Sequence, residues 1–345
     1  MKRIEINPKT KRILLIILSV LLAVILIALI LGTAYMEKML NLINRNPDDS
    51  TMSREEYEQF QQEQQATEET GFTGETIDPN DVTLNLNDKP VESQEHIINI
   101  MLIGQDRRPG EGRSRSDTMI LCTVNKKTKE LTLTSFMRDL YIAIPGYYED
   151  RMNHSYSYGG MKLLDKCLET NFGIKVDGNI EVDFNGFTDV IDLVGGVDIY
   201  LSNSEANHLI AHGHSAQQGM NHLSGEAALM YARNRSVGNG DFSRTERQRK
   251  VVNAIFEKCK GMSLSQLQNL MEKALPMITT DLTNRQILDY LTDLVPLLGD
   301  MKLNTNRIPA DGTYKYASVR GMSVLIPDLE VNRQKLQEII AKTPE

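Results

Sequence analysis

The residues best suited to chemistry in this chain are carboxylates and guanidiniums gathered within residues 97–120. A short apolar segment, Ile97–Ile103, is typical of a buried strand and is followed by Asp106, while Asp117 directly precedes another apolar segment. The turn between these segments carries Arg107, Arg108, Arg113 and Arg115. Aspartate oxygens suit a hard divalent cation, and planar guanidiniums bind phosphate oxygens in pairs. The stretch predicts a divalent metal beside a phosphate group, with a solvated, salt-bridged loop as the alternative.

A second arginine centre lies in residues 225–250. A helix is predicted over Ala227–Ala232, and another helix begins near Asp241, which is a suitable N-cap residue. The polar residues of this centre that suit phosphate binding are Arg233, Arg235, Arg244 and Gln248. The last two are four residues apart and share one helix face. Arginine is preferred over lysine for bidentate phosphate recognition, although an ordinary charged helix is the alternative.

The two centres are expected to meet in the fold. A strand over Glu130–Phe136 leads directly to Arg138, and ligand sites of open α/β sheets collect at strand ends. A pyrophosphate carries more charge than one guanidinium can match. We therefore expect Arg115 and Arg138 to lie against Arg233 and Arg235. Without a ligand, such a cluster is expected to repel itself.

The elements around these residues predict an α/β fold. The segment 151–160 is predicted as a loop that precedes a helix over Met161–Phe172. A strand over Ile180–Phe184 is followed by a helix over Gly186–Val194, capped by Asn185, and then by a further strand over Val197–Leu201. Alternating strands and helices favour a three-layer α-β-α core with a central sheet.

The N-terminal third has a different composition. Basic residues within 1–12 precede an apolar run that starts at Ile13, and its nineteen residues to Leu31 would span about 28 Å as a helix. We predict a cytoplasmic tail (1–12), an uncleaved transmembrane anchor (13–35), an acidic stalk (36–95) and an extracytoplasmic domain (96–345), because the basic flank stays inside. Ser53 and Glu56 could form a capping box for a short helix to about Ala66, and the rest of the stalk is expected to be solvated. A cleaved signal peptide is the alternative, although its apolar region is usually shorter.

Charge and cysteine content exclude other classes. The net charge of −8 gives the whole protein no electrostatic attraction to nucleic acid. Cys122, Cys167 and Cys259 have no short spacing, which argues against a zinc motif or a disulfide framework and favours free thiols.

Several motifs occur together in an order that resembles the LytR-CpsA-Psr family of cell-envelope proteins, over about residues 96–260. They are GQDRR, RSDT, MRD, RMNHSYSYGG, VDFNGF, VGGVDI, LSGEAALMYARNR and GDFSRTERQ. The resemblance implies a three-layer domain whose helices enclose a channel for a polyprenyl chain. It also implies a phosphotransferase that moves glycopolymers from an undecaprenyl pyrophosphate carrier to a muramic acid hydroxyl of peptidoglycan, forming a phosphodiester. A single-pass location in the cell membrane of a Gram-positive-type envelope, with the C-terminal domain on the extracytoplasmic side, agrees with this.

The resemblance also implies roles for single residues. Asp106 and Asp117 match the ligands of Mg²⁺, with Mn²⁺ as a possible substitute, and Asp241 matches an aspartate that activates the acceptor hydroxyl. The residues that match the pyrophosphate clamp are Arg115, Arg138, Arg233, Arg235, Arg244 and Gln248. Of these, Arg138 and Arg235 are expected to act in catalysis together with Asp241.

The sequence departs from the family pattern at two positions. Met137 stands where the family usually has proline, which is expected to loosen the local turn, and Arg151 stands where it usually has lysine. Two other functions stay open: a pyrophosphatase that transfers the same phosphate to water, and a non-catalytic binder of lipid-linked polymer. Binding alone would need the arginines but not Asp106, Asp117 and Asp241.

Overall fold

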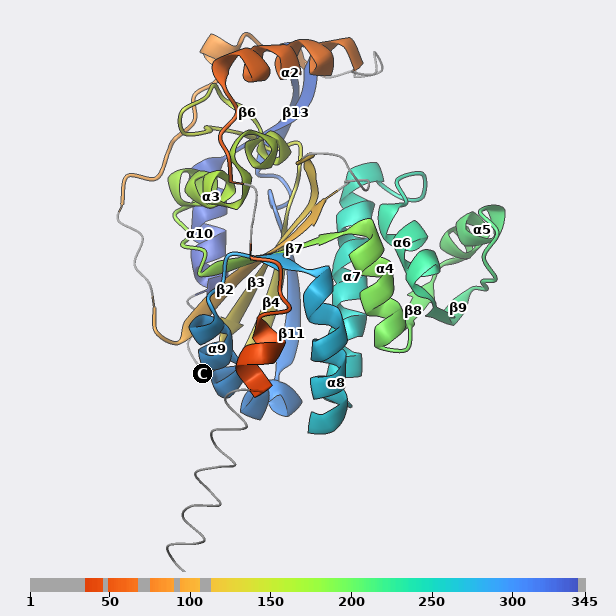
Figure 1. Cartoon of the computed structure of the whole chain (residues 1–345). Helices are drawn as coiled ribbons and strands as arrows, with labels where there is room; N and C mark the ends of the chain where they lie inside the picture. Colours follow the sequence, from red (N-terminus) through yellow and green to blue (C-terminus); the bar gives the residue numbers. More distant parts are fainter. Residues whose placement is uncertain (1–34, 46–48, 68–74, 90–93, 106–112, 341–345) are drawn as a thin grey trace, which may run out of the picture.

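A six-stranded mixed sheet forms the centre of the molecule (Figure 1). The computed structural model describes residues 35–45, 49–67, 75–89, 94–105 and 113–340. In spatial order the strands are β10 (Thr279–Thr280), β7 (Gly178–Asp183), β2 (Ile97–Gln105), β3 (Ser116–Asn125), β4 (Glu130–Phe136) and β11 (Lys302–Ile308). Strand β2 pairs antiparallel with β3 and parallel with β7, and β4 pairs antiparallel with β3 and parallel with β11.

Helices cover both faces of this sheet (Figure 1). The helices on one face are α3 (Met152–Phe172) and α10 (Leu329–Ile340), which share the main hydrophobic core with β2, β3 and β4. The helices on the other face are α4 (Phe184–Leu193), α6 (Gly225–Arg233), α7 (Gly240–Lys260) and α8 (Leu264–Ala274). The predicted α/β fold with a central sheet between two helical layers is therefore confirmed.

The two faces of β2 serve different purposes, because successive side chains of a strand point to opposite sides. Met101 and Ile103 are buried in the core with α3. Leu102 and Gly104 line a cavity under the helices of the other face. The same sheet therefore supplies both a packed core and the floor of a cavity.

Smaller sheets and helices surround the centre. Strands β12 (Tyr314–Val319) and β13 (Met322–Pro327) form an antiparallel pair, and β1 (Glu75–Thr76) joins β12 in parallel. The predicted strand Val197–Leu201 is present as β8, but it pairs with β9 (Gly219–Leu223) outside the central sheet. Further elements include β5 (Tyr141–Ile142), β6 (Asp150–Arg151), α5 (Asn203–Ala211), α9 (Asn284–Leu294) and the 3₁₀ helices η1 (Pro79–Asp81), η2 (Leu275–Met277) and η3 (Val295–Asp300).

The described part of the predicted stalk lies against the domain. Ser53 and Glu56 form the predicted capping box at the start of α2 (Arg54–Thr67). Tyr57 of α2 is buried, with its ring 5.0 Å from that of Tyr158. The prediction of a solvated stalk thus fails for α2, because one aromatic face can dock even where the average composition is acidic.

Helix α3 begins nine residues earlier than predicted. The segment predicted as a loop forms its first turns, and a kink follows at Gly159 and Gly160, where Gly160 has φ 63°. This segment is buried, with His154 Nδ1 lying 3.0 Å from Asp150 Oδ2. Burial of polar and aromatic side chains has overridden a composition that is typical of loops.

Two predicted helix caps are also wrong. Asp183, rather than Asn185, caps α4 by accepting a hydrogen bond of 2.8 Å from Gly186 N. Asn239 occupies the N-cap position of α7, and Asp241 lies within the first turn. The carboxylate of Asp241 is consequently available for contacts with other elements.

Among the residues that the structure describes, no helix is long and apolar enough to cross a membrane. The predicted anchor falls outside those residues, except for Tyr35 at its end.

Candidate active site

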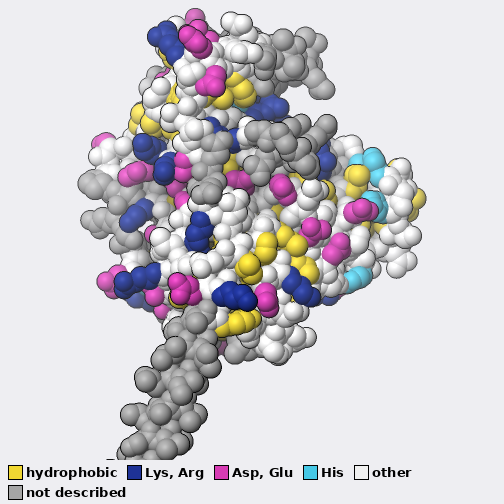
Figure 2. All heavy atoms as spheres, viewed as in Figure 1, with side chains coloured by type: hydrophobic (Ala, Val, Ile, Leu, Met, Phe, Trp, Pro, Cys, Tyr) yellow, Lys and Arg dark blue, Asp and Glu magenta, His cyan; other side chains and the backbone are white. Residues whose placement is uncertain are grey.

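A cavity of about 690 Å³ lies between the central sheet and helices α4, α6, α7 and α8. Its deep part is apolar: Ile180 and Val182 come from β7, Phe187 from α4, and Val252 and Ile255 from α7. Hydrophobic side chains also gather on the surface over α4 and α8, which close this part of the cavity (Figure 2). The apolar lining can hold a hydrocarbon chain without leaving polar groups unpaired.

The mouth of the cavity is strongly charged. The polar residues there include Arg115, Asp117, Arg138, Arg233, Arg235, Arg244 and Gln248. They come from β3 and the residue before it, from the segment after β4, and from α6, α7 and the loop between them. The fold therefore brings the two arginine centres of the sequence to one place, as expected.

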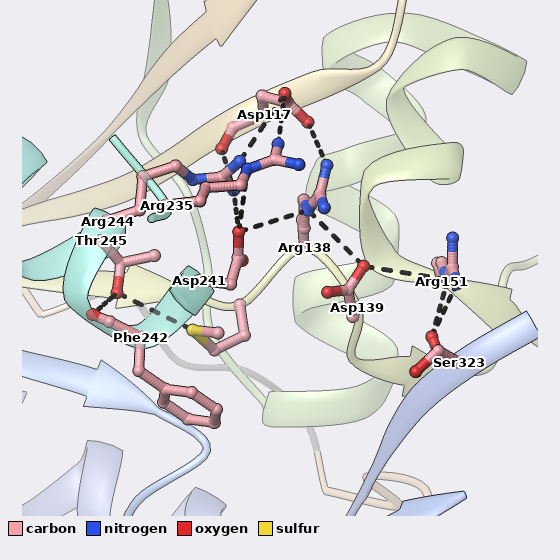
Figure 3. Close-up of polar contacts among 11 residues, drawn as sticks. Asp117, Arg138, Asp139, Arg151, Arg235, Asp241, Phe242, Arg244, Thr245 and Ser323 are labelled. Atoms are coloured by element: carbon pink, nitrogen blue, oxygen red, sulfur yellow. Dashed lines mark hydrogen bonds and ion pairs between the residues drawn. The ribbon is translucent and has the colours of Figure 1, made fainter. Parts of the chain in front are cut away.

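Three guanidiniums surround the carboxylate of Asp117 (Figure 3). Arg138 Nη1 lies 3.1 Å from Oδ1, and Arg235 Nη2 lies 3.3 Å from Oδ2. Arg244 Nη1 lies 3.8 Å from Oδ2, and its Nη2 donates to the backbone oxygen of Asp117 at 3.2 Å.

The same three guanidiniums also contact Asp241 (Figure 3). Arg244 Nη2 lies 2.9 Å from Asp241 Oδ1, while Arg138 Nε and Arg235 Nε each lie 3.6 Å from that oxygen. The expectation of a self-repelling cluster is therefore wrong, since carboxylates within ion-pair distance offset much of the arginines' positive charge.

The two carboxylates nevertheless differ in their acidity. Burial acts to raise the pKa of Asp117, but Arg138, Arg244 and Arg235 outweigh it and hold that pKa below its usual value. Burial raises the pKa of Asp241 above its usual value despite the opposing effect of the same arginines. Environments that separate two carboxyl pKa values are typical of sites that need one permanent anion and one proton acceptor.

Comparison with known proteins identifies the fold and the family. The sequence model of the LytR_cpsA_psr family matches residues 52–339. The chain belongs to this family. The described range of α2 lies within the match, in agreement with its packing against the domain.

Named relatives include transferases of bacilli. The chain is 33% identical over 223 residues to the polyisoprenyl-teichoic acid–peptidoglycan teichoic acid transferase TagU of Bacillus mycoides, covering 64% of this chain and 71% of the relative. It is 32% identical over 233 residues to the TagU protein of Bacillus anthracis, covering 66% and 73%.

Solved structures with the same fold include two further LytR-CpsA-Psr proteins. The structure of B. subtilis TagV is 28% identical with a TM-score of 0.59, covering 73% of this chain and all of that one. The structure of TagT bound to LI-WTA is 26% identical with a TM-score of 0.59, covering 76% and 100%.

The two departures from the LytR-CpsA-Psr pattern have structural explanations. Met137 N donates a hydrogen bond of 2.9 Å to Ile308 O, which proline could not do, so the predicted loosening of this turn is wrong. Arg151 Nε and Nη2 donate to Ser323 O at 3.0 and 2.7 Å. Arg151 therefore hydrogen-bonds to the backbone of β13 and does not line the large cavity.

Three further residues that bear on the site were predicted from the sequence to different degrees. Asp106, the other predicted metal ligand, lies outside the described residues. Asp139, not singled out from sequence, lies with Oδ1 3.6 Å from Arg138 Nε and 3.8 Å from Arg151 Nε. Phe184 holds the guanidinium of Arg233 over its ring at 4.3 Å. The MRD motif contained the signal for Asp139, but adjacency to an arginine alone does not distinguish a site residue.

Proposed function

We propose that this protein transfers a glycopolymer from a polyprenyl pyrophosphate carrier to a muramic acid hydroxyl of peptidoglycan. The observation that carries the proposal is the combination of an apolar cavity with a mouth rich in guanidiniums. This combination suits a ligand with an anionic head and a long hydrocarbon tail. The names of the TagU relatives, and of TagT with its bound ligand, support the same class of reaction.

The proposed reaction is an in-line displacement at phosphorus. The acceptor hydroxyl oxygen forms a bond to the phosphorus that carries the glycopolymer, and the bond from that phosphorus to the oxygen bridging to the lipid phosphate breaks. The electron pair leaves with that oxygen on the polyprenyl phosphate, and Asp241 takes the hydroxyl proton. Arg138, Arg235 and Arg244 stabilise the charge that develops on the phosphoryl oxygens.

We further propose that Asp106 and Asp117 hold Mg²⁺, or Mn²⁺ in its place. Asp117 fits this role, because its low pKa keeps its oxygens anionic at the cavity mouth. Among the described residues no group of three or more His, Cys, Asp or Glu side chains is arranged to hold a metal. Water and substrate phosphate oxygens would complete the shell, as is usual for Mg²⁺. The cation would supply further neutralisation of phosphate charge.

Residues 13–35 are proposed to anchor the protein in the cell membrane, with the domain outside. An anchored enzyme stays close to a substrate that cannot leave the bilayer. Protease added to cells without a wall should remove the domain and leave a small membrane fragment. Complete protection of the domain would contradict this orientation.

The function is tested by product analysis with the full chain in detergent. The purified protein is given a polyprenyl pyrophosphate-linked oligosaccharide and a muramic acid-containing glycan. A transferase yields the glycan phosphodiester together with polyprenyl phosphate. Free oligosaccharide phosphate would instead indicate a hydrolase, and unchanged substrate would indicate a binder.

Variants make this test specific to the site. Asp241→Asn should lower turnover by about 10²–10⁴-fold while donor binding persists, because the proton acceptor is lost. The matched control is Asp289→Asn, which removes a carboxylate that is 66% exposed and pairs with Arg285 on α9. Equal turnover of Asp241→Asn and the control would exclude Asp241 as the base.

A further inference from the structure

A second cavity, of about 190 Å³, lies beside Asp241 but outside the large apolar cavity. Its walls come from the segment after β4, the start of α7, and strands β12 and β13. Asp241 itself lines this small cavity, while its carboxylate contacts Arg138, Arg235 and Arg244, which line the large one. Asp241 therefore separates two sites of different character.

We propose that the small cavity binds one sugar unit of the acceptor glycan and presents its hydroxyl to Asp241. This inference rests on the proposed transfer reaction and assigns that reaction an acceptor site. The volume is below the roughly 300–1,000 Å³ of sites that enclose whole ligands, so it suits a single ring of a longer chain.

An aromatic surface forms one side of the small cavity. Phe242 and Tyr316 line it, and their ring centroids lie 6.4 Å apart. The ring of Tyr314 packs against both, with its centroid 5.6 Å from that of Phe242 and 5.4 Å from that of Tyr316. The guanidinium of Arg307 lies over the ring of Phe242, 4.4 Å from its centroid. Tyr316 is thus braced by its neighbours although it is 51% exposed, as a stacking platform for the apolar face of a sugar requires.

Polar groups line the rest of the cavity. Asp139, Asn239 and Ser323, whose side chains carry a carboxylate, an amide and a hydroxyl group, also line it. Asp139 is held in place by Arg138 and Arg151, at 3.6 and 3.8 Å. A mixture of hydrogen-bonding groups and an aromatic ring matches a sugar, which has hydroxyls on its rim and C–H groups on its faces.

The position of the cavity also suits the direction of the reaction. In-line displacement requires the attacking oxygen and the leaving oxygen on opposite sides of the phosphorus. A donor with its tail in the large cavity places its leaving lipid phosphate toward that cavity. An acceptor in the small cavity would approach from the side of Asp241, which then takes the proton of the hydroxyl as its oxygen bonds to phosphorus.

The experiment compares Tyr316→Ala with the wild-type full chain in detergent. Binding of a muramic acid-containing tetrasaccharide is measured alone, by saturation-transfer NMR titration. We expect Tyr316→Ala to weaken binding about tenfold, and Tyr316→Phe to bind as the wild type does because the ring is retained. The matched control is Tyr200→Ala, since Tyr200 is 62% exposed on β8 and distant from this cavity in the fold. Binding of polyprenyl pyrophosphate should be the same in all four proteins.

The outcomes separate this inference from the proposed function. Equal tetrasaccharide affinity in wild type and Tyr316→Ala, or no binding by the wild type, would overturn the acceptor site. In a transfer assay, Tyr316→Ala should raise the acceptor KM about tenfold with kcat within twofold, and an unchanged KM would likewise overturn it. Tetrasaccharide binding that depends on Tyr316 without any transfer product would support the glycan site and refute the transferase.

Discussion

Arg235 and Arg244 contact the same two carboxylates, yet their replacement by alanine should affect the stability of the unliganded protein to very different extents. The side chain of Arg235 is 44% exposed, whereas that of Arg244 is 2% exposed. Exposed ion pairs contribute about 0–1 kcal/mol to the free energy of unfolding. Loss of one partner from a buried pair costs about 3–5 kcal/mol, because a buried charge stays without compensation.

These values translate into melting temperatures. At about 2–4 °C per kcal/mol for a domain of this size, Arg244→Ala should lower the Tm by roughly 6–20 °C. Arg235→Ala should change it by less than about 4 °C. The control is Arg285→Ala, which removes a guanidinium that is 91% exposed and lies 3.8 Å from the carboxylate of Asp289.

The rise in Tm that a bound pyrophosphate causes should, in contrast, be strongly reduced by Arg235→Ala. Loss of one guanidinium from a bound pyrophosphate should weaken binding by about 1.5–3 kcal/mol, or roughly ten- to a hundredfold or more. With ligand at a thousand times the wild-type Kd, the stabilisation would fall from about 4.1 to about 1.2–2.6 kcal/mol.

The assay is a thermal melting series of the full chain in detergent, with and without a polyprenyl pyrophosphate. If Arg235→Ala keeps the full ligand shift, the guanidinium does not bind the pyrophosphate and the site assignment is wrong. If Arg244→Ala keeps the wild-type Tm, the burial argument is wrong.

Three further predictions concern the metal, the pH dependence and the large cavity. Asp117→Asn should abolish most Mg²⁺-dependent turnover while the protein stays folded, which a Mg²⁺ titration of activity and circular dichroism will measure; unchanged turnover would refute the metal role. Burial raises the pKa of Asp165 to about 7, so the folded state retains a proton that the unfolded state releases near pH 4. The free energy of unfolding should therefore fall by up to about 3 kcal/mol as pH rises from 4 to 7. Thermal melting of Asp165→Asn, which removes the ionisable group beside Asn179, should not show this fall with pH. Val252→Trp should fill the large cavity and weaken binding of long prenyl chains more than short ones, and equal loss for both lengths would contradict a tail site.

Local pattern was enough to predict short strands that are rich in β-branched residues and bounded by turn residues. Glu130–Phe136 and Val197–Leu201 were predicted with the bounds that the structure has, as both are short, β-branched segments. The pattern of Val197–Leu201 did not indicate its partner, because an alternating strand reads the same in a central or a peripheral sheet.

Long-range contacts decided what sequence reasoning missed. The first turns of α3 contain glycine, serine and asparagine, yet they are buried with the His154–Asp150 pair. The aromatic contact from Tyr57 reaches this region from a segment with an acidic, polar composition. Neither contact has a local signature, since each joins residues that only the fold brings together.

The residue types of the site were visible from sequence, but the electrostatic balance was not. Arg138, Arg235 and Arg244 were predicted to meet and are brought together, whereas the pairing of all three with both Asp117 and Asp241 required the structure. The carboxylates pair with the guanidiniums that are proposed to bind phosphate oxygens, and these contacts hold the arginines together in the unliganded protein. A pyrophosphate must then compete with these ion pairs, which lowers its apparent affinity but avoids the cost of assembling the arginines. Because the same arginines fail to offset the burial of Asp241, that carboxylate keeps a raised pKa and a greater affinity for a proton. As phosphate draws the guanidiniums away from Asp241, this affinity should rise further, so donor binding itself would prepare the base for the acceptor hydroxyl.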